Sequence, residues 1–332
     1  MDMFLSTPNA TASQSQWPDS SFSFIPSDVP FYFTHKSRLI DKYSDEALTL
    51  AAPVLSYWFL SLFFHYLDTR TWQWLGQYRI HESAEVQKKN RATRLDVVKA
   101  VFFQQVIQTL LGILWLSEPT TSGTWDQHLR KMGEIAVTIA GFAHRVLGEK
   151  VGEAVLRANG RELVYFVYWW AIPSAQFLAA IFFIDTWQYF LHRGMHLNTF
   201  MYKQFHSWHH RLNVPYAFGA LYNHPVEGFL LDTLGAALAE YVTGMTTRQA
   251  MLLFTVSTFK TVDDHCGYTL PWDPLQLITK NNANYHDIHH QTIGIKSNFA
   301  QPFFIHWDSL LGTRMTREEM EELKRKRYQK KE

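Results

Sequence analysis

The sequence predicts an all-α integral membrane protein, with three or four membrane-embedded helical elements and a cytoplasmic, histidine-rich helical cap. Three observations lead to this prediction. Uncharged apolar runs long enough to cross a bilayer recur ahead of the histidine-rich region. Aromatic residues make up 16% of the chain, more than a soluble core of this size needs, and they suit a lipid boundary. Ten of the 16 histidines lie between His192 and His290.

Length, charge and cysteine content narrow the class of protein. A chain of 332 residues forms one or two domains. The formal net charge of +1 offers no basic footprint for phosphates, so we expect no nucleic-acid partner. The single cysteine, Cys266, excludes an internal disulfide and is interpreted as a small buried side chain.

The sequence divides into four expected parts. They are a lumenal amino-terminal tail (1–46), membrane spans with connecting segments (47–184), a catalytic region including a membrane hairpin (185–315), and a charged cytoplasmic tail (316–332). Residues 1–34 lack a basic region followed by an apolar run, so they are not expected to be a cleavable signal peptide. Its sequon at Asn9 matters only if this tail faces a lumen.

Three apolar runs are the span candidates. Residues 47–67 carry no formal charge and are followed by a loop rich in Lys and Arg, which marks that side as cytoplasmic. Residues 97–116 form a second candidate, which Glu118-Pro119 ends. Residues 163–184 form the third, with a kink expected at Pro173, and this run leads directly into the histidine-rich region.

Two further segments have helical patterns. In residues 132–147 the apolar residues recur at helical spacing, which suits a helix lying on the membrane or a soluble amphipathic helix. Residues 229–262 are apolar but interrupted by charges and Gly244, which indicates a hairpin whose two ends return to the same side. Such a hairpin would bring His265 back to the other histidines.

Three histidine clusters organise the chain: His192 with His196, His206 with His209 and His210, and His286 with His289 and His290. On a helix, spacings of three and four residues put the imidazoles of each cluster on one face, so each cluster can supply ligands to one side of a metal site. Burying eight imidazoles without a metal would cost roughly 1–3 kcal/mol for each unpaired group. Eight ligands exceed what one ion takes, so two metals are implied. Imidazole suits iron, copper, nickel and zinc alike.

Other interpretations were weighed against a membrane metalloenzyme. A lone histidine in an apolar helix is usually a satisfied core residue, but three clusters at chelating spacing are not lone histidines. A zinc hydrolase would need a general base, as in His-Glu-x-x-His, and this motif is absent. A non-enzymatic metal-binding or transport protein would place its ligands at mid-membrane, whereas these clusters follow the spans.

The clusters, together with the phrases Asn223-His-Pro-Val-Glu227 and Asp264-His-Cys-Gly-Tyr268, resemble the fatty acid hydroxylase and sterol desaturase superfamily of integral membrane di-iron enzymes. The resemblance covers roughly residues 184–314. Within the superfamily, residues 261–274 and 281–291 look most like the fungal sphingolipid C4-hydroxylases. These are O2-dependent monooxygenases that convert sphinganine or dihydroceramide to the phytosphingosine form.

The resemblance implies a set of metal ligands and no catalytic residue beyond the metal centre. The matching positions are His192, His196, His206, His209, His210, His265, His286, His289 and His290. His224 is a further candidate, with a hydrogen-bonded turn histidine as its alternative interpretation. Five carboxylates lie within reach in sequence to accept the second ring N–H of a ligand: Asp185, Glu227, Asp263, Asp264 and Asp287. The alternative for Asp263, Asp264 and Asp287, which adjoin ligands directly, is that their side chains are solvated or point elsewhere.

The resemblance also implies cofactors, partners and a location. Two iron ions are expected, which zinc can replace in purified material. Electrons are expected from cytochrome b5 and its NAD(P)H reductase, because the chain has no flavin or cytochrome fingerprint of its own. A multi-pass protein of the endoplasmic reticulum membrane is expected, and the ending Lys330-Lys331-Glu332 is close to a dilysine retrieval signal. A related oxygenase acting on fatty acyl C2 or on a sterol shares the same histidines and stays open as the alternative.

Overall fold

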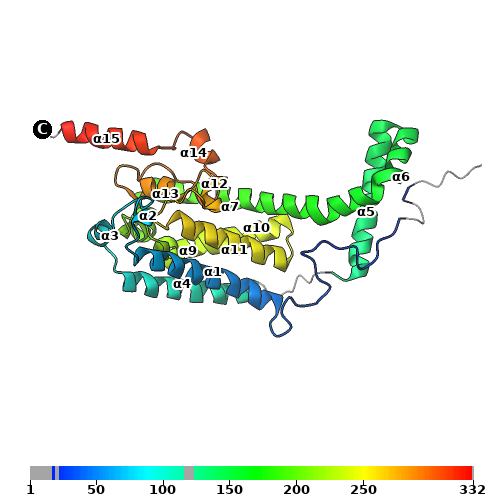
Figure 1. Ribbon diagram of the computed structural model, residues 1–332, viewed down its shortest axis with the longest axis horizontal. Coiled ribbons are helices and arrows are strands. Elements are labelled where there is room, and N and C mark those ends of the chain that lie inside the picture. The colour runs from blue at the N-terminus through cyan, green and yellow to red at the C-terminus, as the bar shows by residue number, and fades with distance from the viewer. Residues whose placement is uncertain (1–16, 19–21, 116–122, 331–332) are drawn as a thin grey trace, which may run out of the picture. The chain divides into compact units, whose positions relative to one another are not determined.

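The computed structural model describes residues 17–18, 22–115 and 123–330 (Figure 1). These residues form helices joined by loops, with two isolated β-bridges and no strand, so the all-α prediction is confirmed. The sequon at Asn9, the Glu118-Pro119 step and the last two residues lie outside the described part of the chain. The α-helices are α1 (Asp45–Asp68), α2 (Gln73–Gly76), α3 (Ser83–Lys89), α4 (Arg94–Trp115), α5 (Trp125–Leu147), α6 (Glu149–Phe166), α7 (Ile172–Leu197), α8 (Thr199–Met201), α9 (Pro225–Gly228), α10 (Gly235–Thr243), α11 (Thr247–Asp264), α12 (Pro274–Ile278), α13 (Ala283–His290), α14 (His306–Leu310) and α15 (Arg317–Gln329).

Five shorter helical turns of other types interrupt or join these helices. Three are π-helical and two are 3-10. They are η1 (Val167–Ala171), η2 (Tyr202–His206), η3 (His209–Arg211), η4 (Ala217–Leu221) and η5 (Phe229–Leu234). The π-turn η1 lies directly before Pro173, where a kink was expected, because a proline inside a helix lacks the amide that the regular ladder uses.

Three helices of the described residues are long and apolar enough to cross a membrane. They are α1, α4 and the continuous helical run Glu149–Leu197, which includes α6, η1 and α7. Each matches one of the three spans expected from the sequence. The run of 49 residues is much longer than the roughly 20 residues that a bilayer requires.

The chain forms two compact units. The first contains residues 1–36 and 123–175. In it, α5 and α6 pack as a hairpin around Gly148, whose φ of 76° suits glycine. Part of the expected amino-terminal tail packs on this hairpin, because Trp17 and Phe24 are buried against α5 and α6. At Gly160 an added Cβ would meet the Trp17 ring at 2.5 Å, so the bare helix face makes room for the indole.

The second unit contains residues 37–122 and 176–332 and holds all three histidine clusters. Helices α4, α1 and α11 lie side by side in this order, with α4 at one edge of the unit (Figure 1). The predicted hairpin is present as η5 and α10 followed by α11. Gly244, in the left-handed conformation, ends α10, and Thr246 begins α11 with a capping box. Helix α11 packs along α1 and ends at Asp264. The next residue, His265, lies beside the clusters.

Candidate metal centre

Nine buried histidines converge in the second unit, and they are the nine predicted ligands. They form two groups, within each of which one ring nitrogen per residue lies within 4.8 Å of all the others. We call them the five-histidine group and the four-histidine group. The first contains His192, His196, His206, His210 and His289, and the second contains His209, His265, His286 and His290.

The groups do not follow the sequence clusters. His206 and His210, four residues apart, join the five-histidine group, while His209 joins the four-histidine group. In the third cluster the pair four residues apart, His286 and His290, joins the four-histidine group, and His289 joins the other. Each of these two clusters therefore contributes to both groups. From the sequence we expected each cluster to supply ligands to one side of one metal site only. The chain segments at residues 206–210 and 286–290 consequently hold the two groups together.

The three clusters lie in different kinds of local backbone structure. His192 and His196 lie on one face of α7, and the third cluster lies on α13, as predicted. The second cluster is not on a regular α-helix, because it begins in the π-turn η2 and ends in the 3-10 turn η3. His206 and His209 nevertheless divide in the same way as His286 and His289 on α13: residues four apart share a group, and the residue three after the first joins the other group.

Backbone carbonyls fix the tautomer of five of these histidines. In each, Nδ1 donates to a carbonyl oxygen, which can only accept, so Nε2 of the neutral ring carries a lone pair. The pairs are His192 with Phe299 (2.8 Å), His209 with Tyr222 (3.3 Å), His265 with Thr261 (2.8 Å), His289 with Ser297 (2.7 Å) and His290 with Leu212 (2.7 Å).

The Nε2 atoms fixed in this way face one another. In the four-histidine group, Nε2 of His209 and Nε2 of His265 are 3.5 Å apart, and neither can carry a proton. In the five-histidine group, Nε2 of His289 is buried and has no hydrogen-bond partner. Facing lone pairs repel, and a cation between them turns repulsion into coordination. The donor set therefore fits metal ions, with only imidazole nitrogen as the ligand atom.

Burial keeps these rings neutral, which is the form that binds a metal. Desolvation lowers the pKa of His209 to about 4 and that of His265 to about 3. Burial, assisted by neighbouring imidazoles, holds the pKa values of His206, His210, His286, His289 and His290 well below the usual range.

One loop, residues 297–300, supplies the carbonyls of Ser297 and Phe299 to both His289 and His192. Asn298 has a left-handed φ of 55°. Its side-chain amide donates to the backbone carbonyls of Tyr285 and Met315 and accepts from the Met315 amide, which fixes the loop. Asp308, fully buried, accepts from the amides of Phe299 and Ala300 at 3.0 and 2.8 Å. Sequence reasoning missed this loop, because backbone acceptors leave no residue-type signal.

Of the five carboxylates expected to orient ligands, only Glu227 does so. Its Oε1 is 2.5 Å from Nδ1 of His206, and both side chains are buried. Burial raises the pKa of Glu227 well above its usual range and lowers that of His206, so this pair is neutral until a nearby cation favours the carboxylate.

The other four carboxylates have structural partners, so that expectation is wrong for them. Asp185 accepts from the backbone amides of Phe303 and Phe304, which anchors the loop after residue 300 to α7. Asp263 accepts from Gln276, and Asp264 pairs with the buried Lys260. The sequence showed only that these residues adjoin ligands, and adjacent residues on a helix point in different directions.

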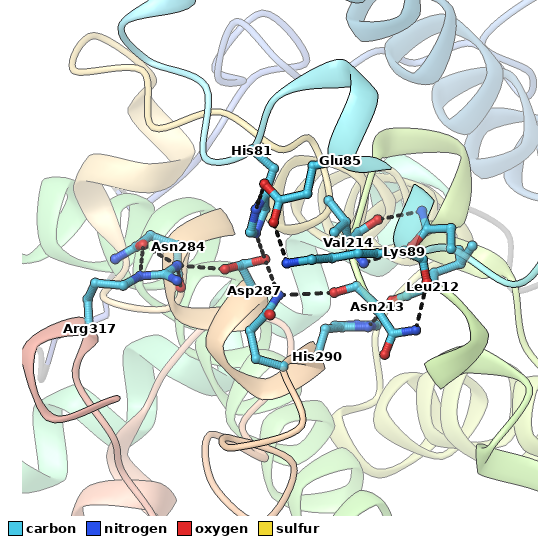
Figure 2. A network of polar contacts seen from close by, with 12 residues as sticks. His81, Glu85, Lys89, Leu212, Asn213, Val214, Asn284, Asp287, His290 and Arg317 are labelled. Carbon is cyan, nitrogen blue, oxygen red and sulfur yellow. Dashed lines mark hydrogen bonds and ion pairs between the residues drawn. The ribbon is translucent and has the colours of Figure 1, made fainter. Parts of the chain in front are cut away.

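Asp287 is the fourth, and it belongs to a polar network on the outer side of α13 (Figure 2). Its two oxygens accept from Nε2 of His81 at 2.8 Å and from the Arg317 guanidinium at 2.7 Å. The same helix places Gln291 against the carbonyl of Asn213 (3.0 Å), one residue after the Leu212 carbonyl that fixes His290. The network thus ties the helix that carries three candidate ligands to the segments before α4 and at the start of α15.

His224 lies outside both groups. It caps the amino terminus of α9, where its Nδ1 accepts from the Val226 amide at 3.2 Å, and its ring contacts Phe205 and Trp208. The structure thus supports the turn-histidine interpretation. The phrase Asn223-His-Pro-Val-Glu227 has its main role at its end, where α9 presents Glu227 to His206.

Two adjoining cavities lead to the histidines. The larger, of about 440 Å³, lies among α1, α4, α7, α10 and α11 and has mostly apolar walls. The smaller, of about 20 Å³, is lined by His206, His209, His265 and His286. Gln188, Asp232, Thr261 and Pro302 line both. A long apolar molecule in the larger cavity would therefore present one end to the metal centre.

Comparisons with known proteins agree with this arrangement. The family model for fatty acid hydroxylases matches residues 177–313, which include both histidine groups. The sphingolipid C4-hydroxylase SUR2 of Saccharomyces cerevisiae is 47% identical over 84% of this chain and 74% of its own. Sphinganine C4-monooxygenase 1 of Arabidopsis thaliana is 43% identical over 82% and 88%, respectively.

A relative with a different name is also similar. The very-long-chain aldehyde decarbonylase GL1-9 of Oryza sativa subsp. japonica is 39% identical over 82% of this chain and 90% of its own. No solved structure gives a significant match.

Proposed function

Because this chain belongs to the fatty acid hydroxylase family and, within it, to the sphingolipid C4-hydroxylases, we propose that it hydroxylates C4 of sphinganine or dihydroceramide. The products are phytosphingosine or phytoceramide. The observation that carries the proposal is the apolar cavity of about 440 Å³ that shares four residues of its wall with the histidine-lined cavity. A lipid chain can fill the first while the carbon near its polar head reaches the second.

The nine histidines are proposed as ligands of two iron ions, one in each group, and His224 is not among them. Iron bound there supplies the oxidant that an unactivated C–H bond requires. The overall reaction consumes the C–H bond, O2, two electrons and two protons and gives C–OH and one water. Residues 185–315 are the proposed catalytic region.

The chain's own residues would prepare this chemistry. The backbone carbonyls and Glu227 hold six of the nine imidazoles in a fixed orientation, so little reorganisation of these rings is needed when the metal ions bind. The nine rings are buried, which keeps bulk water away from the reacting carbon. The cavity wall aligns the lipid chain, and positioning of this kind contributes much of an enzyme's rate.

Electrons are proposed to come from cytochrome b5 and its NAD(P)H reductase, and the location is proposed to be the endoplasmic reticulum membrane. The basic segment between α1 and α4 supports a cytoplasmic side for the histidine groups. Protease digestion of sealed microsomes tests this topology. It should remove the carboxyl-terminal tail and spare residues 1–46, whereas protection of the carboxyl-terminal tail would reverse the orientation.

The substrate is tested with microsomes that contain this chain, NADPH, O2 and sphinganine deuterated at C4. The expected product is 4-hydroxysphinganine that has lost one deuterium and gained one oxygen atom from O2. Parallel reactions contain a fatty acyl substrate, a sterol and a long-chain aldehyde. The C4 assignment is wrong if the preparation does not oxidise C4 and instead hydroxylates acyl C2, modifies the sterol or shortens the aldehyde.

A further inference from the structure

A single carboxylate lines the wall where the lipid-sized cavity meets the histidine-lined cavity. It belongs to Asp232, in the middle of the π-turn η5 that precedes α10. Asp232 lines both cavities, and the smaller one also exposes His206, His209, His265 and His286. The carboxylate therefore lies where the polar end of a bound lipid would approach the metal centre.

Two amide side chains hold this carboxylate by one oxygen. Gln104 of α4 donates to Oδ2 of Asp232 at 3.3 Å, and Asn223 donates to the same oxygen at 3.4 Å. Among the described residues, no donor lies within hydrogen-bonding distance of Oδ1. The arrangement fixes the direction of the carboxylate and leaves one oxygen for a ligand in the cavity.

The backbone makes room for this arrangement at Gly228. An added Cβ at this position would meet Nε2 of Gln104 at 2.4 Å and its Cδ at 2.5 Å. The absence of a side chain lets the Gln104 amide lie against α9 and reach Asp232. This packing fixes the carboxylate through α4 and α9, while the second amide, that of Asn223, also contacts His209.

The carboxylate has no cationic partner among the side chains that the structure describes. An ionised carboxylate buried with two neutral amides alone is costly, and a cation in the cavity offsets that cost. Sphinganine carries an ammonium group on C2, two carbons from C4. A ceramide carries a neutral amide there.

We propose that Asp232 binds the ammonium group of a free sphingoid base and thereby places C4 at the metal centre. This inference rests on the proposed function and makes it narrower, because it selects sphinganine over dihydroceramide as the preferred substrate. The alkyl chain then runs away from the histidines along Leu111, Leu234 and Phe254. Asp232 is a positioning and specificity-determining residue in this scheme.

The test compares Asp232→Asn with the unaltered protein in the same detergent or microsomal preparation. The substitution keeps the shape of the side chain and removes its charge. Because a hydrogen bond to a charged group is stronger than a neutral one, KM for sphinganine should rise about 10- to 100-fold, with a smaller change in kcat. Octadecylamine, a cationic inhibitor without hydroxyl groups, should lose potency by a similar factor, while neutral octadecanol should keep its potency.

Glu240→Gln is the matched comparison. Glu240 is the other carboxylate among the described residues of the larger cavity's wall, eight residues along the chain from Asp232, and unlike Asp232 it does not line the cavity that the histidines line. Its substitution should preserve the ratio between octadecylamine and octadecanol inhibition. Loss of amine selectivity in Glu240→Gln but not in Asp232→Asn would overturn the proposal and reverse the direction of the bound lipid.

A rival role for Asp232 is to compensate the charge of the metal ions. That role predicts that Asp232→Asn loses metal and weakens octadecylamine and octadecanol equally, and either result would overturn the ammonium assignment. If turnover in the variant is too low to measure inhibition, the increase in Tm that each compound produces gives the same comparison. Failure of the C4 assignment itself appears separately, as an unaltered protein that oxidises sphinganine elsewhere or not at all.

Discussion

The two compact units use histidine in opposite ways. In the unit of residues 1–36 and 123–175, His128 lies among aromatic rings, with Nδ1 2.5 Å from the Tyr168 hydroxyl, and His35 contacts the carbonyl of Pro26 at 2.7 Å. In the other unit, nine imidazoles direct Nε2 atoms at one another. The difference shows that a histidine becomes a candidate ligand when its Nε2 faces further imidazoles, and in six of the nine an acceptor also fixes Nδ1.

The sharpest way to test this contrast is to remove one histidine from each environment. His289→Ala and His209→Ala each take one nitrogen from a different group, so hydroxylation should fall by more than about 100-fold, beyond the loss typical of residues that only support ligands. His128→Ala and His35→Ala should leave turnover nearly unchanged. Product formation in microsomes, normalised to the amount of protein in the membrane, is the measurement.

Normal turnover in either cluster variant would remove that histidine from the ligand set. A loss in His128→Ala as large as in His289→Ala would mean that the contrast between the two units is not a contrast in function.

A smaller effect is expected from the one carboxylate that orients a ligand. Glu227→Gln keeps the size of the side chain but changes the acceptor for Nδ1 of His206, so metal affinity or activity should fall about 10- to 100-fold. Asp263→Asn is the matched control, because Asp263 is a buried carboxylate next to a ligand that bonds to Gln276 instead of an imidazole. Metal titration of both purified variants measures the difference, and equal losses would show that buried charge alone matters.

The smallest effect is expected at the edge of the network in Figure 2. Arg317→Gln removes the guanidinium from Asp287 while His81 keeps its contact, so α13 should be held less firmly and activity should fall by less than about 10-fold. Lys326→Gln, in an exposed ion pair with Glu322 on the same helix, should have no measurable effect. Hydrogen exchange of α13 amides is the direct readout, and unchanged exchange in Arg317→Gln would exclude the network from this role.

Much of the centre could be predicted because its signal lies in residue type and spacing. Eight histidines at chelating intervals identify the site, and the interrupted apolar run before Val262 correctly places the ninth, His265, beside it. The three spans follow from apolar length alone. These features are visible within short stretches of the sequence, either as runs of apolar residues or as histidines at helical spacing.

What the sequence could not give depends on contacts between distant segments. The division of the histidines into two groups depends on how the segment at residues 206–210 packs against α7 and α13, which no residue pattern predicts. The carbonyls of Ser297 and Phe299 reach His289 and His192 only because Asp308 and Asn298 fold their loop. Neither the acceptor role of a backbone oxygen nor the cavity at Asp232 is encoded by a motif.

Metal analysis of the active, detergent-purified protein tests the central claim most directly. The two groups predict two iron ions for each chain, and they predict that His289→Ala and His209→Ala each reduce the metal content. Zinc in place of iron in an overexpressed preparation is compatible with the account, because zinc stands above ferrous iron in the Irving–Williams order. One metal ion per chain in fully active protein would contradict it.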